Sequence, residues 1–333
     1  MNITKPTIHD VAREAGVSTA TVSRVLNHKD NVSEHVEARV LEAAKRLSYR
    51  IPGPVFPQRT GTHLVAVVAP SLSNPFYNDI LDGIQSVLDN NDYNMVIIQS
   101  KSKGNFRAST LDFFRQDIFD GLITLEYADN MKNLYAAVNP SLPVVQCCEY
   151  DENLPYPYVG IDDYQAAYNA VSLLYHTGRR RIAFLNSTRR SMYGRKRENG
   201  YRDALLHYSL TLDESLIYHL TTINFDVALS VAYRLLTDAG RPDAIFAVSD
   251  IYAIAVTRAA HDLGLRIPED VAVMGFDNIS MAAMNEPPLT TVNMPRYDIG
   301  STSAASLIRL INQHSALSQG VILAADVVVR SST

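Results

Sequence analysis

The residues from Thr7 to Asn27, TIHDVAREAGVSTATVSRVLN, constrain the fold more than any other part of the chain. A first helix is expected after Thr7, because Thr7 is a good N-cap and Asp10 follows three residues later, as in a capping box. Gly16 then permits the positive φ of a tight turn, and Ser18 can cap a second helix. The apolar positions of the first helix repeat at the spacing of one helix face: Ile8, Val11, Ala12 and Ala15. The pattern predicts a helix–turn–helix.

The second predicted helix has two different faces. At about 100° per residue, one face is apolar and consists of Val22, Val25 and Leu26. The opposite face consists of Ala20, Ser23, Arg24 and Asn27. An arginine can donate two hydrogen bonds to guanine, and the hydroxyls of Thr21 and Ser23 suit phosphate oxygens. This face predicts a helix that enters a groove of DNA, with an ordinary surface helical hairpin as the alternative.

The distribution of charge agrees with a nucleic-acid partner at the N-terminal end. Residues 1–60 carry nine Lys or Arg against six acids, a net charge of +3, although the whole chain carries −5. This places the attraction for a polyanion at one end. Because this excess of positive charge is small, one copy of the N-terminal region is expected to bind DNA weakly, and two copies are expected to be needed.

A third helix is expected from Ser33, with a buried stripe of Val36, Val40, Ala43 and Leu47, which completes a three-helix headpiece over residues 1–50. The run DVAREAGVSTATVSRVLN followed by VSEHVEARVLEAAKRLSY resembles the headpiece of the LacI/GalR family of bacterial repressors. This resemblance implies that Thr19, Ala20 and Arg24 face base edges while Thr21 and Ser23 contact phosphates. The predicted DNA-binding residues are Thr7, Ser18, Thr19, Ala20, Thr21, Ser23, Arg24, Asn27 and Phe56.

Residues 63–333 are predicted to form an α/β core. Short, continuously apolar runs alternate with helical stretches, which indicates parallel sheets covered on both faces. The runs are 64–69, 95–99, 121–125, 143–148, 181–186, 244–249 and 271–276, and a final strand is expected in VILAADVVVR. This number of strands fits two doubly wound lobes better than one. Lobe one is expected at 63–160 and 293–320, and lobe two at 161–292 and 321–333.

The core also resembles the LacI/GalR family, whose core is similar to periplasmic sugar-binding proteins. The matching phrases include SNPFYNDILDGI, RKRENGYRDAL, FAVSDIYAIAV and IPEDVAVMGFDNI, and the wording CEYDENLPYPYVGID resembles the cytidine-regulator branch. The resemblance implies a homodimer that binds a pseudo-palindromic DNA operator and a sugar or nucleoside effector. It places effector contacts at the strand ends. Where the family has an aspartate and an arginine, this chain has Cys148 and Glu149.

The predicted effector-binding residues are Phe76, Tyr77, Glu126, Arg197, Phe225, Asp250 and Asp277. Aromatic faces can stack on a ring, and carboxylates and a guanidinium can hold hydroxyl groups. Structural alternatives stay open for several of them. Asp250 could be the N-cap of a helix that starts at Ile251, and Phe76 and Phe225 could be core residues. Arg197 is expected to open a helix that ends at Gly200-Tyr201, where it could be a solvated charge. This combination of aromatic, acidic and arginine side chains predicts a ring-shaped, hydroxyl-rich effector without strong charge.

No metal, cofactor or catalytic residue is expected. The adjacent Cys147 and Cys148 lack CxxC spacing, and the nine histidines lack metal-ligand spacing. The alternatives, an α/β enzyme or a periplasmic-type solute-binding protein, lack support, because no GxSxG, P-loop or HExxH motif and no signal peptide is evident. No apolar run approaches about 18 residues, so no membrane span is expected. The expected location is the cytoplasm, at the nucleoid.

The linker at 51–62 departs from its family. Members have a segment that folds into a short helix on DNA and wedges a leucine into the minor groove. Here Gln58 stands at the leucine position, and Pro57 costs about 3 kcal/mol inside a helix. Gly53 adds about 1 kcal/mol against a helix. We therefore expect an extended tether, with Phe56 as the candidate wedge and a less bent operator.

This tether predicts tolerance of half-site spacing. Operators with one to three base pairs inserted between half-sites should still bind, because extended tethers do not clamp the two headpieces in one register. Gel-shift titration of the series measures this. A loss of more than about a hundredfold on the first insertion, with a sharp bend in gel phasing, would mean that the linker folds on DNA.

Overall fold

The computed structural model describes residues 7–26, 34–47, 61–100, 106, 108–116, 118–126, 128–313 and 320–333. The chain divides into two compact units, Met1–Thr60 and Gly61–Thr333. The linker residues 51–60 and their Phe56 lie outside the described residues.

The first unit contains three helices, α1 (Ile8–Ala15), α2 (Thr19–Leu26) and α3 (Glu34–Arg46). The predicted capping box is present, because the backbone N–H and the hydroxyl of Thr7 both donate to Asp10 Oδ2, at 2.8 and 2.7 Å. Gly16 ends α1 with a φ of 62°, as the turn requires. The side chain of Arg39 in α3 donates to the carbonyl of Ala15 and so ties this turn to the third helix.

The three headpiece helices share one small apolar core. Val11 from α1, Val22 from α2 and Val40 from α3 are fully buried in it. Alanines fill the spaces between them, and Val36 and Leu47 pack at its edge. The predicted buried stripes of the three helices are therefore confirmed for the side chains that the structure describes, while the expected helix start at Ser33 lies outside the described residues.

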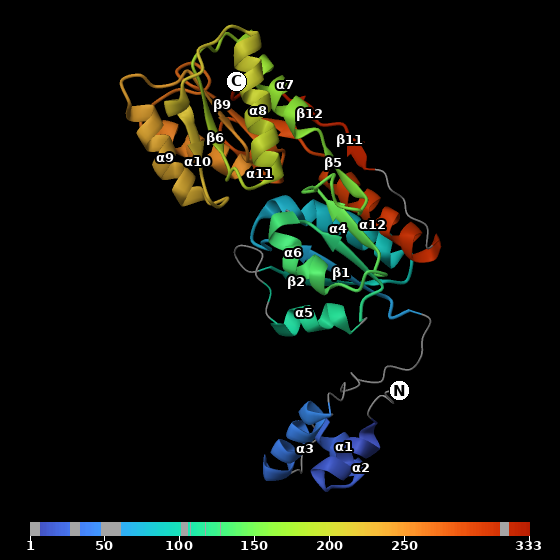
Figure 1. Ribbon diagram of the computed structural model, residues 1–333. Helices are drawn as coiled ribbons and strands as arrows, with labels where there is room; N and C mark the ends of the chain where they lie inside the picture. The colour runs from blue at the N-terminus through green and yellow to red at the C-terminus, as the bar shows by residue number, and fades with distance from the viewer. Residues whose placement is uncertain are drawn as a thin grey trace. The chain divides into compact units, whose positions relative to one another are not determined.

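The second unit contains two six-stranded sheets (Figure 1). The first has the order β11-β5-β4-β3-β1-β2, and all its neighbours pair in parallel. Its strands are β1 (Leu64–Ala69), β2 (Asn94–Gln99), β3 (Gly121–Thr124), β4 (Val144–Cys147), β5 (Tyr158–Ile161) and β11 (Val321–Leu323). Its helices are η1 (Pro75–Tyr77), α4 (Asn78–Asp89), α5 (Ala108–Arg115), α6 (Ala128–Ala137) and α12 (Arg296–Gln313).

The second sheet has the order β12-β10-β9-β8-β6-β7, and only β12 runs antiparallel to its neighbour among the described strands. Its strands are β6 (Ile182–Asn186), β7 (Ile217–His219), β8 (Ala244–Ala247), β9 (Ala272–Asp277), β10 (Thr290–Asn293) and β12 (Asp326–Val328). Its helices are α7 (Asp163–His176), α8 (Met192–His207), η2 (Glu214–Leu216), α9 (Phe225–Thr237), α10 (Asp250–Asp262) and α11 (Ser280–Met284).

The chain passes between the two lobes three times: after β5, after β10, and between β11 and β12. One expected boundary is therefore wrong. The run VILAADVVVR is two strands, and the first of them, β11, completes the sheet of lobe one although residues 321–333 were expected in lobe two. The other two crossings follow Ile161 and Asn293, next to the approximate boundaries that were expected. Hydrophobic runs cannot reveal these crossings, because the strands of both sheets have the same continuously apolar sequence pattern.

The seven apolar runs that the sequence singled out all form strands, and these strands lie in the interior of the sheets or at the β2 edge. Strands β11 and β12 occupy the run where one final strand was expected, and the strands that were not predicted are β5, β7 and β10. They are three or four residues long and mix polar with apolar residues, so their pattern does not stand out from a loop.

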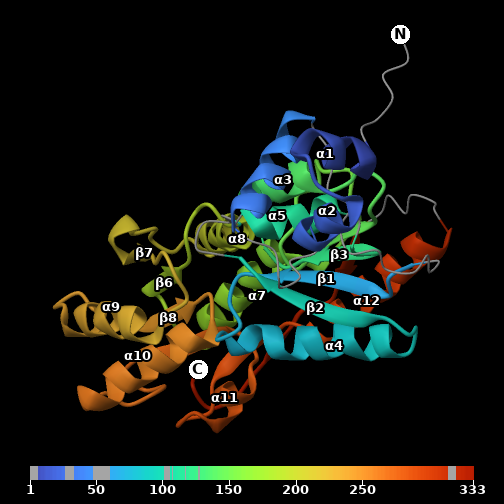
Figure 2. The same ribbon diagram turned by 90° about the horizontal axis from the view of Figure 1, so that it is seen from below.

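Helices α4 and α12 lie side by side (Figures 1 and 2) because glycines let their backbones approach. A Cβ atom on Gly83 would overlap the carbonyl oxygen of Tyr297, and one on Gly300 would overlap the carbonyl of Ile80. Neither obstacle is a flexible side chain, so the two helices would have to separate.

We expect Gly300→Ala to lower the free energy of unfolding by about 1–3 kcal/mol, as overpacking does in other cores. Urea unfolding followed by circular dichroism measures this. Gly240→Ala is the matched control, because a Cβ there meets nothing closer than 3.5 Å. Equal stability of the two variants would contradict the close packing of α4 on α12.

Candidate functional site

Helix α2 exposes the face that was predicted to read DNA. Ala20 is exposed and Thr19 and Thr21 are partly exposed, whereas Val22 lies in the headpiece core. The hydroxyl of Ser18 accepts a hydrogen bond from the backbone N–H of Thr21 at 3.1 Å, so Ser18 caps α2 as predicted. A small, partly hydroxylated surface of this kind can approach a groove closely.

The other residues predicted to bind DNA are less defined. Thr7 is engaged in its capping box. Ser23 and Arg24 lie within α2, although their side chains are not among the described parts. Asn27 and Phe56 lie outside the described residues.

The second unit contains a cavity of about 570 Å³ between its two lobes. Lobe one contributes Tyr77, Glu126 and Glu149, which follow the ends of β1, β3 and β4. Lobe two contributes Tyr193 and Phe225, at the starts of α8 and α9. This volume lies within the range of about 300–1,000 Å³ that is usual for small-molecule sites, and the carboxyl ends of parallel strands are where doubly wound folds bind ligands.

A smaller cavity of about 60 Å³ shares Tyr77, Glu149 and Tyr193 with the large one. Asp163, Arg197 and Asp277 also line it, and all three are buried. We call the two cavities together the pocket. Most of its charged side chains line the smaller part, so this part can orient a ligand that fills the larger part.

Arg197 is the centre of these polar groups. Its Nε donates to Asp163 Oδ1 at 2.8 Å, and its Nη1 donates to the carbonyl of Val248 at 2.7 Å. The guanidinium also lies over the ring of Phe276, 3.4 Å from the ring centroid. Its burial excludes the alternative of a solvated charge. The expected helix was wrong, because Arg197 lies inside α8, which continues to His207, and does not open a helix that ends at Gly200-Tyr201.

Asp277 ends β9 and lines the smaller part of the pocket. Its φ of 108° is unusual for a non-glycine residue, and such strain is typical of functional positions. Burial raises the pKa of Asp277 to about 8, although the charge of Arg197 opposes the shift. At neutral pH this carboxyl can therefore hold a proton and donate as well as accept.

Asp250 is not among the residues that line the pocket, and its predicted effector contact stays a prediction. The carboxylate accepts from the backbone N–H of Ile279 at 2.8 Å and from the hydroxyl of Thr291 at 2.6 Å. Its alternative role as an N-cap is wrong, because Ser249 is the N-cap of α10 and accepts from the backbone N–H of Ile251. Asp250 instead positions the segment that follows Asp277.

The predicted aromatic residues surround the pocket. Tyr77 lines both parts, Phe76 lines the smaller part, and Phe225 lines the larger part while remaining 36% exposed. Phe76 and Tyr77 also pack edge to face and lie against the apolar core, so Phe76 combines the structural and the binding alternatives. Buried Glu126 lines the larger part and accepts a hydrogen bond from Ser100.

The pocket residues that were absent from the predicted set include Glu149, Asp163 and Tyr193. Glu149 had a detectable signal, because it directly follows a buried strand as Glu126 does, and it replaces the arginine of the family pattern. Asp163 comes two residues after β5, a strand that was not predicted, and Tyr193 follows no strand directly. They begin or nearly begin helices, and their role follows from the three-dimensional approach of α7 and α8.

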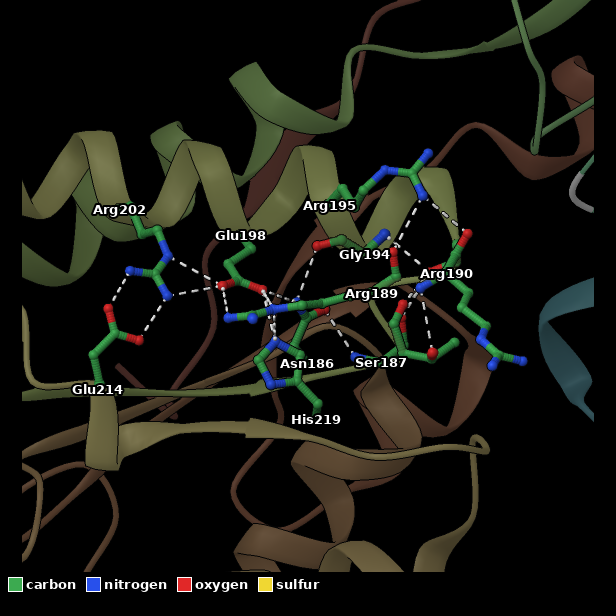
Figure 3. A network of polar contacts seen from close by, with 12 residues as sticks. Asn186, Ser187, Arg189, Arg190, Gly194, Arg195, Glu198, Arg202, Glu214 and His219 are labelled. Carbon is green, nitrogen blue, oxygen red and sulfur yellow. Dashed lines mark hydrogen bonds and ion pairs between the residues drawn. The ribbon is translucent and has the colours of Figure 1, made fainter. Parts of the chain in front are cut away.

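A polar network holds the start of α8 beside the pocket (Figure 3). Buried Glu198 contacts Arg189 and Arg202 at 2.9 Å and His219 Nε2 at 2.7 Å. Desolvation alone would raise the pKa of Glu198, but the hydrogen bonds from these side chains outweigh it and lower the pKa to about 2. Asn186 at the end of β6 donates to both Glu198 and the Gly194 carbonyl, which connects the strand to the first turn of α8.

Within the described parts of the chain, no cluster of His, Cys, Asp and Glu is arranged to hold a metal ion. None of the described helices is long and apolar enough to cross a membrane.

Known proteins match both units of the chain. Residues 7–51 match the family model "Bacterial regulatory proteins, lacI family", and residues 171–333 match "Periplasmic binding protein-like domain". Catabolite control protein A of Priestia megaterium is 33% identical over 100% of both chains. The HTH-type transcriptional repressor CytR of Escherichia coli (strain K12) is 30% identical over 99% of this chain and 97% of that one. A solved complex of the transcriptional regulator CelR with cellobiose has a TM-score of 0.74 and 30% identity, and covers 98% of this chain and 100% of that one.

The expected fold class is confirmed: a helix–turn–helix headpiece with a periplasmic-binding-protein-like core of two lobes. The branch within the family stays a prediction, because relatives with different printed names have similar identity. The full-length matches and the headpiece family model together establish that this chain belongs to the lacI family of bacterial transcriptional regulators.

Proposed function

We propose that the protein acts as a homodimer at a pseudo-palindromic DNA operator and that a small polar ring compound in the pocket sets its operator affinity. The observation that carries this proposal is the pocket, where buried polar side chains from both lobes surround a cavity of about 570 Å³. A sugar or a nucleoside is the class of ligand that matches aromatic walls and hydrogen-bonding groups. The related CelR was solved with cellobiose, a sugar.

The connection between pocket and operator is a conformational equilibrium. Three chain crossings join the lobes, and the pocket has walls from both. A ligand that contacts both lobes binds one lobe arrangement better than another and shifts the population toward it. Such coupling is typically worth about 1–3 kcal/mol, which corresponds to a change in operator affinity of about 5- to 150-fold.

The same reading assigns no catalytic activity to the chain. The charged side chains of the smaller part of the pocket are three carboxyls and one arginine, which is engaged with Asp163. The relative CytR, matched over 99% of this chain, is a transcriptional repressor, which supports this assignment. A protein that reads DNA works where the chromosome is, so we place it in the cytoplasm at the nucleoid.

The assignment of base reading to α2 can be tested at Arg24. Arg24→Ala should cost about 1–3 kcal/mol of operator binding and relax the preference at one guanine in each half-site, because a bidentate contact is lost. Arg46→Ala is the matched control, since it removes one exposed headpiece arginine from α3. Selection of binding sites from random DNA should return a changed logo for the first variant alone. An unchanged logo for Arg24→Ala would remove Arg24 from the reading face.

The pocket assignment can be tested at Asp277. In a thermal-shift screen, sugars and nucleosides in excess should raise the unfolding temperature according to RT ln(1 + [L]/Kd). Asp277→Ala should lose this shift and the ligand-dependent change in operator affinity, because a buried hydrogen-bonding partner is removed. Operator titration without ligand is run in parallel. Calorimetry that shows tight binding of sugar phosphates alone would contradict this pocket, since its carboxyls repel a phosphate group.

A further inference from the structure

Glu149 has one carboxylate oxygen that the fold does not use. The residue is 8% exposed, follows β4 and lines both parts of the pocket. Its Oε2 accepts a hydrogen bond from the backbone N–H of Met192 at 3.3 Å, across the two lobes. Its Oε1 is buried and has no hydrogen-bond partner among the described residues. Buried polar atoms are nearly always paired in folded proteins, so this oxygen is available for a ligand.

The charges around Glu149 indicate what that ligand group is. Three buried carboxyls line the smaller part of the pocket, those of Glu149, Asp163 and Asp277. Among the described residues that line either part, Arg197 is the one cation, and it is already paired with Asp163. The pocket therefore has more carboxyl groups than cations, and a hydrogen-bond donor of positive or partly positive charge complements their carboxylate form.

We propose that the pocket recognises a polyhydroxylated ring that carries an amino group, and that this amino group donates to Glu149 Oε1 between Tyr77 and Tyr193. The inference rests on the proposed function and narrows its ligand class. Both tyrosines line both parts of the pocket, so their rings can lie against the ligand ring. A cationic amine also gains from an aromatic face. Amino sugars and nucleosides with an exocyclic amino group share this chemistry.

A purely structural role explains Glu149 less well. As a tie between the lobes, Glu149 needs only the hydrogen bond from Met192 to Oε2. A glutamine could make the same hydrogen bond without bringing a third acid into the pocket. The free oxygen and the acidic surroundings are both consistent with a role in binding a donor.

The test uses the full-length protein and pairs of probes that differ at one amino group: D-glucosamine with D-glucose, cytidine with uridine, and adenosine with inosine. Isothermal titration calorimetry should find at least one pair whose amino member binds tenfold or more tightly. Glu149→Gln should remove that preference, because a neutral amide cannot make the charge-assisted hydrogen bond. Glu269→Gln is the matched control, since it neutralises an exposed glutamate that does not line the pocket.

A proton-linked signal gives a second readout. Burial, and then the charge of Asp163, raise the pKa of Glu149 to about 8 while Arg197 opposes them, so the empty pocket holds a proton there at pH 7. An ammonium group favours the carboxylate, and binding should release part of a proton. Titrations in phosphate and in Tris should therefore differ in apparent enthalpy, and less so for Glu149→Gln. The other titratable groups that face Glu149 are Tyr77, Cys148 and Tyr193. Burial raises the pKa of both tyrosines, and the hydrogen bond with Cys147 together with burial raises the pKa of Cys148, so all three move further from neutrality.

The results separate the inference from the proposed function. Equal binding within every pair, preference for the non-amino members, no binding of any amino member, or a preference that survives Glu149→Gln would each overturn the amino-group inference. If Glu149→Gln does not fold, Glu149→Asp is measured instead, and its shorter side chain should also weaken the preference. Operator titration of the same preparations tests the proposed function separately. If operator affinity responds only to a ring compound without an amino group, the amino-group inference fails but the proposed function stands.

Discussion

The buried ion pair between Arg197 and Asp163 organises the centre of the core. Asp163 begins α7, directly after the chain crosses from the first lobe, and Arg197 comes from the middle of α8. The same guanidinium holds the carbonyl of Val248 after β8 and covers Phe276 in β9. One side chain thus sets the distance between two helices and two strand ends. Loss of either charge would leave the other buried and unpaired, which is far more costly than loss of a surface pair.

This arrangement turns the second lobe into a rigid wall for the pocket. Helix α8 is fixed in its middle by Arg197 and along its outer side by the contacts of Glu198 with Arg189, Arg202 and His219. Its first turn, which carries Tyr193, therefore has a defined position. Glu149 reaches this turn from the first lobe and accepts a hydrogen bond from the backbone N–H of Met192. Lys196, in the same helix, pairs with Glu152 of the first lobe at 3.2 Å. Polar contacts of this kind between lobes can rearrange when a ligand changes how the lobes meet.

The sequence was informative where its patterns depend on local physics. The capping residues Thr7 and Ser18, the turn at Gly16 and the long apolar strands all follow from nearest-neighbour chemistry, and they are present in the structure. The roles of carboxylates at strand ends were harder to predict, because a position after a strand does not reveal the direction in which the side chain points. Asp277 and Asp250 both follow apolar runs, yet the first lines the pocket and the second supports the backbone behind it. The burial of Arg197 depended on Asp163, which lies 34 residues earlier in the chain.

The core contains two kinds of buried carboxyl, and their surroundings separate structure from binding. Glu198 is surrounded by donors, so its pKa is lowered to about 2 and its charge is stabilised by the fold. Burial instead raises the pKa of Glu149 and of Asp277 to about 8, because too few donors compensate for lost solvent. If Glu149 and Asp277 served stability alone, an apolar side chain of similar size would cost less. Buried carboxyls with strongly raised pKa values are found mainly where binding or catalysis needs them. Both Glu149 and Asp277 line the pocket.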